Sequence, residues 1–184
     1  LQVEDFVSFD SQRVTWNRGL KNDLQKNNEI IFDEKSVVIG LYRPFFKQIV
    51  YFSKDLNDMI YQIPKIFPNS KIENIVICLS GKTTGLSVLL SKMIPDLHVI
   101  GDTQCFPLYY YEQRPKSSPT LFDEAGDSEY IRRDGVSDFI LHRTHQQYGK
   151  NVTKEDIFYY VYGFLHSPDY RTAFANDLKK MLPR

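Results

Sequence analysis

Four short apolar runs between residues 74 and 111 dominate the hydrophobic pattern of the chain. They cover residues 75–79, 86–90, 97–100 and 104–111, and polar or glycine-containing loops separate them. Apolar runs of this length between turn residues are typical of β-strands. The pattern therefore predicts that this stretch forms the central sheet of a domain.

A polar loop at residues 80–85 joins the first two runs and carries Lys82, Thr83 and Thr84. Its Gly-Lys-Thr sequence imitates the end of a phosphate-binding P-loop, but that motif needs another glycine five positions before the second. Val76 occupies that position, and the run after the loop is strand-like, whereas a P-loop opens a helix. We expect instead a hairpin, with glycines at positive φ and an exposed Lys/Thr tip.

The segment before the sheet predicts an amino-terminal helix. Trp16, Leu20 and Leu24 recur at the spacing of one helical face. Arg18 and Lys21 belong to the same segment, and they form either a solvated face or a set of phosphate contacts.

Short strands and a bend follow this helix. Pro44 removes a backbone donor and favours extended geometry at Arg43, which predicts a bend at a strand end. We expect Arg43 and Lys47 to point outward there, while Tyr42 and Phe45 anchor inward. Arg43 is either part of a salt-bridged corner or a nucleic-acid contact. The expected elements are strands at residues 30–32, 37–41 and 49–52 and a short helix at residues 55–63.

The remainder of the chain predicts a helical unit. A loop rich in proline, serine and glycine occupies residues 112–126, and from about residue 127, Tyr130 included, the pattern becomes helical. Thr153 and Asp156 resemble a capping box, and Ser167-Pro168 is typical of a helix start. The predicted fold is α+β: a sheet-based core over residues 1–126, including the amino-terminal helix and a small mixed sheet, and a carboxyl-terminal helical subdomain over residues 127–184. This subdomain would pack on the core or on a neighbouring domain.

Composition narrows the function classes. The chain has 184 residues, which suits one domain or a domain with an appended subdomain. Its 23 basic and 23 acidic residues argue against a strongly basic nucleic-acid coat and leave room for a local basic face. Cys78 and Cys105 lie in apolar runs, as small core residues of a reducing compartment do. With no apolar run long enough to span a membrane, we expect a soluble, cytoplasmic protein.

Catalytic motifs are not evident. A DNA amino-methyltransferase needs two adjacent prolines before an aromatic residue, and no two prolines adjoin here. A metal-dependent nuclease could use Asp10 or Asp96 with Asp33 and Lys35, which is a weak match and stays an alternative. His142 and His145 have helical spacing, but nothing nearby in the sequence completes a metal site. We assign no catalytic residue and no metal ligand.

An ordered series of short motifs nevertheless carries a family likeness. Taken together, the series resembles the C-terminal specificity domain of Type ISP restriction-modification enzymes, and the likeness covers nearly the whole chain. These enzymes are single chains that join a nuclease, a helicase-like ATPase, an adenine methyltransferase and a target-recognition domain. The motifs are Trp16-x-Arg18-x-Leu20-Lys21, Tyr42-Arg43-Pro44-Phe45, residues 74–81, Pro95-Asp96-Leu97-His98, residues 104–109, residues 153–163, Pro168-x-Tyr170-Arg171 and residues 177–184.

The resemblance implies sequence-specific recognition of double-stranded DNA. The chain would direct adenine methylation and ATP-dependent translocation and cleavage by other domains of its parent chain, and it would contact the methyltransferase domain. The fragment itself would be no enzyme and would need no cofactor, whereas S-adenosylmethionine, ATP and magnesium would serve the parent chain. The family's catalytic motifs match nothing here. Our DNA-binding candidates are Arg18, Lys21, Arg43, Lys47, Gln48, Lys82, Thr83 and Thr84.

Two alternatives remain open at this stage. One is the metal-dependent nuclease domain, and the other is a protein-docking module that uses the helical tail at residues 153–182. A large apolar patch on the tail would favour docking.

Overall fold

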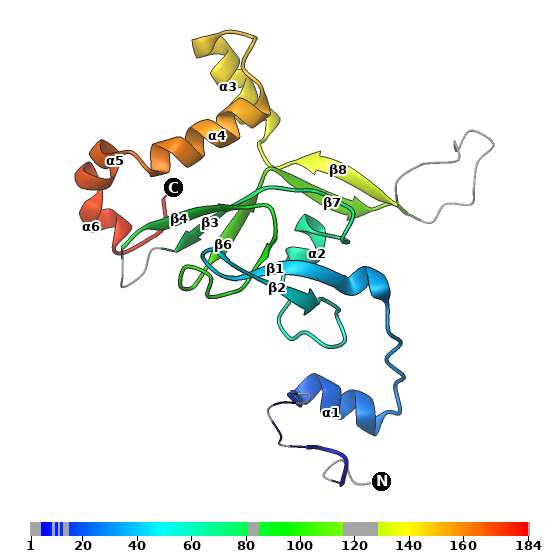
Figure 1. Ribbon diagram of the computed structural model, residues 1–184. Coiled ribbons are helices and arrows are strands. Elements are labelled where there is room, and N and C mark those ends of the chain that lie inside the picture. The colour runs from blue at the N-terminus through cyan, green and yellow to red at the C-terminus, as the bar shows by residue number, and fades with distance from the viewer. Residues whose placement is uncertain are drawn as a thin grey trace, which may run out of the picture.

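The computed structural model of the protein describes residues 5–8, 10, 12, 15–80, 85–115 and 129–183. Within these residues the fold is α+β, as predicted, with a helix near the amino-terminal end, three small sheets and a run of helices toward the carboxyl-terminal end (Figure 1). The strands are β1 (Val37–Arg43), β2 (Phe46–Tyr51), β3 (Val76–Ser80), β4 (Ser87–Ser91), β5 (Ile94–Pro95), β6 (Gln104–Pro107), β7 (Tyr109–Gln113) and β8 (Tyr130–Asp134). The helices are α1 (Arg18–Gln25), α2 (Ile63–Ile66), α3 (Asp138–Tyr148), α4 (Lys154–Leu165), α5 (Pro168–Ala173) and α6 (Ala175–Leu178), with a 3₁₀ turn at Glu34–Ser36.

The first sheet has the strand order β2-β1-β5. β1 and β2 form an antiparallel hairpin, and β5 lies parallel to β1 on its other side. Gly40 sits where these strands come closest, because a Cβ on it would lie 2.9 Å from the Val50 side chain and 3.4 Å from the Ile94 carbonyl oxygen. A larger residue at position 40 would push β1 away from its neighbours.

The second sheet has the order β4-β3-β6 and confirms the hairpin prediction. β3 pairs antiparallel with β4, and Gly85 takes a φ of 86° just before β4. A strand, β4, follows the loop, whereas a P-loop is followed by a helix. Lys82, Thr83 and Thr84 lie outside the described residues, and their part in binding stays a prediction.

The third sheet is the β7–β8 hairpin, and it corrects the expectation that Tyr130 is helical. Tyr130 pairs with Gln113, and β8 forms backbone hydrogen bonds with β7. Pairing with a distant strand overrides the local pattern here. The division of the chain at residue 126 stays a prediction.

Three other predicted elements are also wrong. Residues 97–100 form a turn, because the Asp96 carboxylate accepts the His98 N–H and the Asp96 carbonyl accepts the Val99 N–H. Residues 30–32 belong to no described strand, although Phe32 stacks on Tyr51. Residues 55–63 are not helical apart from Ile63, since Met59 and Tyr61 have φ values of 52° and 46°.

The core lies between the second sheet and α4. Ile77 and Leu79 of β3 cluster with Leu108 and with Phe158 and Leu165 of α4. A second cluster on the other face of β3 joins Val76 and Cys78 to Ile66 and Phe67. Both faces of β3 are therefore buried, which is why residues 76–79 are all apolar.

Buried Asn74 connects these layers. Its side-chain Nδ2 donates to the Ile66 and Tyr109 carbonyl oxygens at 2.9 and 2.6 Å, and its Oδ1 accepts the N–H groups of Ile75 and Tyr109. The amide thus makes four hydrogen bonds that join α2, β3 and β7.

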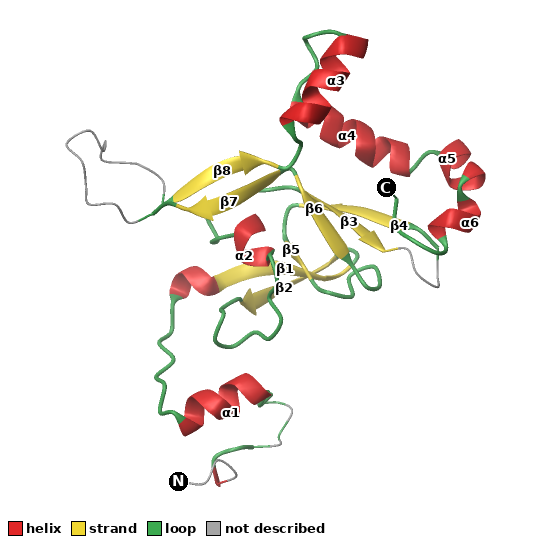
Figure 2. Ribbon diagram, turned by 180° about the vertical axis from the view of Figure 1, so that it is seen from behind, coloured by secondary structure: helices red, strands yellow, loops and turns green. Residues whose placement is uncertain are grey.

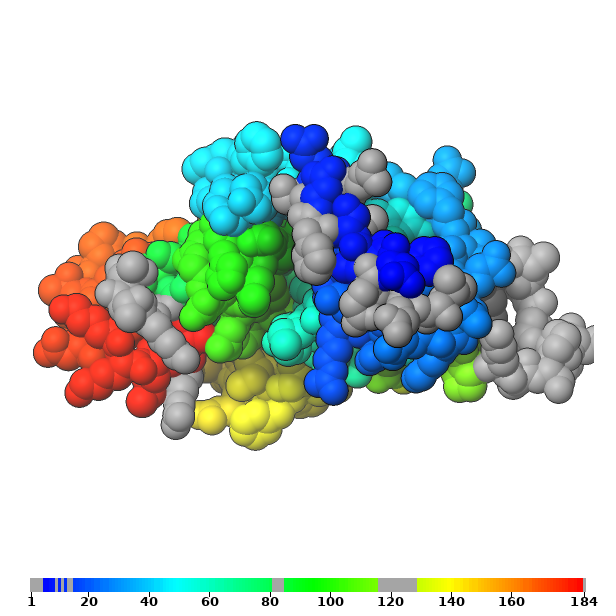
Figure 3. Space-filling model, turned by 90° about the horizontal axis from the view of Figure 1, so that it is seen from below, coloured from blue at the N-terminus to red at the C-terminus, as the bar shows by residue number. Residues whose placement is uncertain are grey.

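Helix α1 and helices α3–α6 lie on different sides of the sheets, and α2 lies among the sheets (Figure 1). α1 stands apart from the sheets in two opposite views, joined to β1 by an extended segment (Figures 1 and 2). Figure 3 shows α4–α6 in orange and red at one end, and the blue amino-terminal segment lies across the middle of this face. Among the described residues, no helix combines the length and apolar character that membrane crossing requires.

The predicted capping box opens α4. The Thr153 hydroxyl accepts the Asp156 N–H, and the Asp156 carboxylate accepts the Thr153 N–H at 2.9 Å. Hydrogen bonds from the Thr153 hydroxyl and N–H lower the pKa of Asp156. The box therefore contributes fully above the ordinary pKa of aspartate and weakens as the pH falls through the lowered value.

We expect Thr153→Ala to lower the free energy of unfolding by about 1 kcal/mol, because the first turn of α4 loses its cap. Urea denaturation followed by circular dichroism measures this change. The exposed Thr172 of α5 provides the control, and Thr172→Ala should change stability by less than about 0.5 kcal/mol. Equal effects of the two substitutions would contradict the role of the box.

Candidate nucleic-acid interface

The tip of the β1–β2 hairpin projects an aromatic side chain. Arg43 pairs with Phe46 across a two-residue turn, Pro44-Phe45. Phe45 has a φ of 70° and is 93% exposed, and Tyr42 is 40% exposed. The expectation that Tyr42 and Phe45 anchor inward is therefore wrong, because no described element covers the end of so tight a turn.

Arg43 forms the salt-bridged corner that was one of its two predicted roles. Its Nη1 donates to the Tyr42 carbonyl oxygen at 2.8 Å and to Asp96 Oδ1 at 3.2 Å, and its guanidinium lies 4.0 Å from the centre of the Tyr42 ring. A guanidinium has five N–H donors, so these contacts leave some of them for a ligand. The side chain is 45% exposed. A DNA contact by Arg43 stays a prediction.

Lys47 and Gln48 lie on opposite faces of the hairpin. Lys47 pairs with Leu41, and Gln48 pairs with Gly40. Lys47 is exposed, and no carboxylate of the described residues forms an ion pair with it. Gln48 lines a cleft on the face opposite Lys47.

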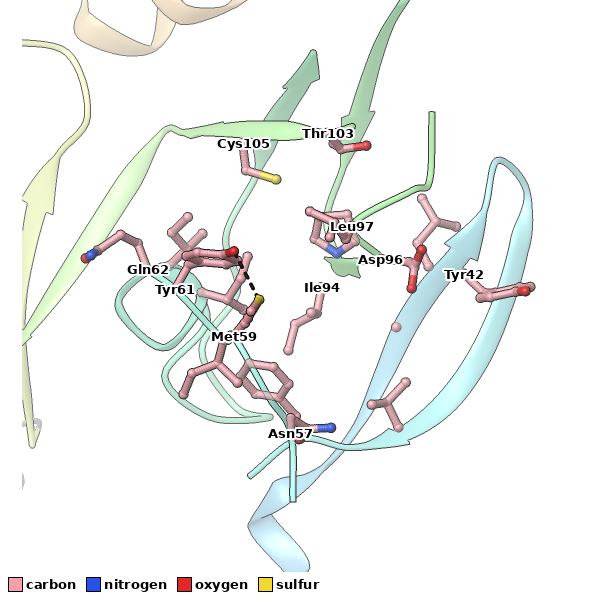
Figure 4. A pocket seen from close by; sticks show the side chains of 18 of the residues that line it. Tyr42, Asn57, Met59, Tyr61, Gln62, Ile94, Asp96, Leu97, Thr103 and Cys105 are labelled. Atoms are coloured by element: carbon pink, nitrogen blue, oxygen red, sulfur yellow. Dashed lines mark hydrogen bonds between the residues drawn. The ribbon is translucent and has the colours of Figure 1, made fainter. Parts of the chain in front are cut away.

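This cleft has a volume of about 690 Å³ and lies between the hairpin, residues 57–63 and residues 94–105. Figure 4 shows Met59 and Tyr61 from one side and Ile94 and Cys105 from the others around the same space. The Tyr61 hydroxyl contacts Met59 Sδ at 3.4 Å, which joins two residues of the strained loop. The Asp96 carboxylate that holds Arg43 also belongs to the wall of the cleft.

Three glutamines line the cleft: Gln48, Gln62 and Gln104. All three are exposed, and among the described residues none makes a side-chain hydrogen bond. A glutamine amide carries both donors and an acceptor, and it can bond an adenine edge at two points. The cleft therefore combines an apolar floor with free amides of the type that read bases.

Of these three glutamines, only Gln48 is among the DNA-binding candidates that the sequence predicts. These residues share a surface only because β5 pairs with β1 and β6 pairs with β3. No local motif signals these pairings, which join Gly40 to Ile94 and Leu79 to Gln104. The ordered motif at residues 104–109 did include Gln104, as part of the family likeness and not as a contact.

Cys105 lies opposite Cys78 in the β3–β6 pair, and both thiols are free. A hydrogen bond to Cys105 and burial raise the pKa of Cys78 above its ordinary value. The same hydrogen bond lowers the pKa of Cys105, although burial opposes it. The two thiols therefore lie against each other beside the cleft, whose lining includes Cys105.

The two candidates on α1 lie apart from this surface. Arg18 is exposed and Lys21 is half-buried. Because α1 stands away from the sheets in both Figures 1 and 2, the structure does not bring Arg18 and Lys21 to the hairpin.

The described residues give no support to a nuclease centre. They contain no cluster of three or more side chains from His, Cys, Asp and Glu that could hold a metal. Asp33 precedes β1, and Asp96 follows β5, which runs parallel to β1 beside its far end. The length of β1 therefore separates the two carboxylates by about 20 Å, at roughly 3.3 Å per residue. His142 and His145 bind the backbone carbonyls of Asp138 and Val152.

The chain matches the Type ISP C-terminal specificity domain family over residues 1–184 and belongs to that family. Three solved structures support the assignment across the fold. All of the chain is similar to 17% of a chain in the cryoEM structure of the DrdV–DNA complex, with 32% identity and a TM-score of 0.80.

Two further structures give comparable values. For the ATP-dependent Type ISP restriction-modification enzyme LlaBIII bound to DNA, the identity is 30% and the TM-score 0.76, over 93% of this chain and 11% of that one. For a nuclease-deletion mutant of the Type ISP enzyme LlaGI in complex with a DNA substrate mimic, the identity is 31% and the TM-score 0.73, over 99% of this chain and 12% of that one. The chain thus spans less than a fifth of each of these chains. No curated protein matches it.

Proposed function

We propose that the protein recognises a specific sequence in double-stranded DNA on behalf of a restriction-modification enzyme. Its membership of the specificity-domain family across residues 1–184 carries this proposal. The three similar structures, all solved with DNA or a DNA mimic, support it.

The hairpin and the cleft suit this function. The major groove of DNA admits a two-stranded β-ribbon, and the β1–β2 hairpin is such a ribbon with an exposed end. Lys47 would contact phosphate and fix the position of the ribbon, whereas the cleft glutamines would contact base edges. Arg18 and Lys21 would extend the phosphate contacts along α1.

The activities of the parent chain are part of the same proposal. Other domains would methylate adenine with S-adenosylmethionine and would translocate and cleave DNA with ATP and magnesium. The chain itself would catalyse no reaction. The cytoplasmic location stays a prediction.

The helical tail gives a second, compatible role. Tyr160, Phe164, Tyr170 and Phe174 form a row of neighbouring rings with centroids 4.5 to 6.1 Å apart, and Tyr160 is 70% exposed. Tyr160, Phe164 and Phe174 are exposed and Tyr170 is half-buried against the core. Neighbouring exposed rings are typical of a protein contact surface. We propose that this row contacts the methyltransferase domain of the parent chain, since the solved enzymes are far longer than this chain. Substitution of Tyr160 and Phe164 by serine should then weaken that contact and leave DNA binding unchanged.

A binding selection tests the proposed function. The protein is incubated with a pool of random duplexes at low salt, and bound DNA is amplified and sequenced over several rounds. We expect a defined motif to be enriched. Recovery of DNA without any preferred sequence would contradict target recognition.

We expect Lys47→Ala to weaken binding of the selected duplex uniformly across sequences. Loss of one phosphate contact should reduce the slope of log K against log salt by about 0.9, because one fewer counterion is released. Titrations at several salt concentrations measure the slope. Lys179→Ala removes an exposed cation just after α6 and should leave it unchanged. Equal slopes for Lys47→Ala and the unmodified protein would rule out this contact.

A further inference from the structure

Phe45 combines two features that disfavour its place at the hairpin tip. Its φ of 70° is uncommon for a bulky residue, and its ring is 93% exposed, the highest value among the large hydrophobic side chains of the described residues. Glycine or asparagine would meet the backbone geometry with less strain. Neither intramolecular packing nor turn geometry therefore accounts for a phenyl ring at this position.

The residues below the ring hold the tip in one orientation. The Tyr42 and Phe46 rings meet edge to face with centroids 6.1 Å apart, and the Arg43–Asp96 ion pair joins the hairpin to the segment after β5. The Asp96 N–H also donates to the Leu41 carbonyl oxygen at 2.9 Å. The ring thus projects from a supported base.

Two basic side chains at the base of the turn favour a partner that carries phosphates. The guanidinium of Arg43 and the ammonium of Lys47 stand on β1 and β2 beside the turn, where phosphates on either side of an inserted ring would lie. Asp96 offsets the charge of Arg43, so the net positive charge at the tip comes from Lys47. Apolar side chains such as phenylalanine are those that DNA-bending proteins insert between base steps. The hairpin also exposes the apolar side chains of Ile39, Phe46 and Ile49, so a protein contact is the alternative that the test must separate from insertion.

We propose that Phe45 inserts between adjacent base pairs of the bound DNA and unstacks them. This inference rests on the proposed function, and it assigns to Phe45 the separation of one base step in the recognised DNA. The strain at Phe45 then has a physical role, because it fixes the ring in the direction of insertion before DNA binds. Base–aromatic stacking offsets part of the cost of opening the base step.

The test uses the duplex enriched by the binding selection, with 2-aminopurine placed at successive positions. Fluorescence of this base rises when it loses its stacking neighbours. We expect the unmodified protein to raise the fluorescence at one base step. Phe45→Gly should abolish that rise and lower the affinity by about 5- to 150-fold, while its thermal unfolding stays unimpaired. Phe45→Leu, which keeps an apolar wedge, should retain part of both signals.

Phe139→Ala is the matched control, because it deletes a phenyl ring that is 66% exposed on α3. It should leave fluorescence and affinity unchanged. Binding by Phe45→Gly with unchanged affinity and fluorescence would overturn the wedge and leave DNA recognition standing, with the ring assigned to a protein contact. Failure of the unmodified protein to enrich any duplex would overturn both.

Discussion

Replacing Asn74 by leucine is expected to lower the free energy of unfolding by about 4 kcal/mol. The substitution removes four hydrogen bonds and leaves the N–H groups of Ile75 and Tyr109 and the carbonyls of Ile66 and Tyr109 without their partner. Leaving one buried polar group unsatisfied costs about 1–3 kcal/mol, and shared relaxation keeps the sum below the simple total. Urea denaturation at equilibrium measures the loss.

Asn151 provides the control for this substitution. It is an exposed residue in the turn before α4, and Asn151→Ala should change stability by less than about 0.5 kcal/mol. A loss below about 1 kcal/mol for Asn74→Leu would contradict the role of Asn74 as the link between α2, β3 and β7. Because Ile66 also lines the cleft, a weakened link should loosen the cleft as well.

Gln48→Ala is expected to relax the sequence preference of the protein at one base pair of the enriched motif. A bidentate glutamine–adenine contact discriminates against the wrong base by about 1–3 kcal/mol, which is roughly 5- to 150-fold in relative affinity. Competition between the selected duplex and its single-base variants measures the preference at each position. Retained preference at all positions would remove Gln48 from base recognition.

The matched control for Gln48 is Gln147, an exposed glutamine on α3. Gln147→Ala should leave every position of the motif unchanged. Gln62→Ala and Gln104→Ala extend the same experiment around the cleft, and each should affect a different base pair if the cleft reads sequence as a unit.

The elements that the sequence predicted correctly are those defined by local chemistry. Thr153 and Asp156 cap α4 because both partners lie within one turn of helix. The β3–β4 hairpin follows from two apolar runs around a loop that contains Gly85. Helix α1 begins two residues after Trp16, within the accuracy with which a helix end can be defined.

The elements that it missed depend on distant partners. Tyr130 lies in a strand because β8 forms backbone hydrogen bonds with β7. The hydrophobic pattern around residue 130 does not indicate that pairing. The cleft forms where β5 meets β1, a pairing between residues 40–41 and 94–95. We expected Phe45 to point inward, but its side chain is exposed because no described element packs against the end of the two-residue turn.

We propose that this chain chooses the DNA sequence on which a restriction-modification enzyme acts. The most direct test of this proposal replaces the matching segment of LlaBIII, which is 11% of that chain, by residues 1–184 and maps the bases that the hybrid methylates. We predict methylation at the motif enriched by the isolated chain and at none of the sites of unmodified LlaBIII. Methylation by an active hybrid at the original LlaBIII sites would contradict the claim.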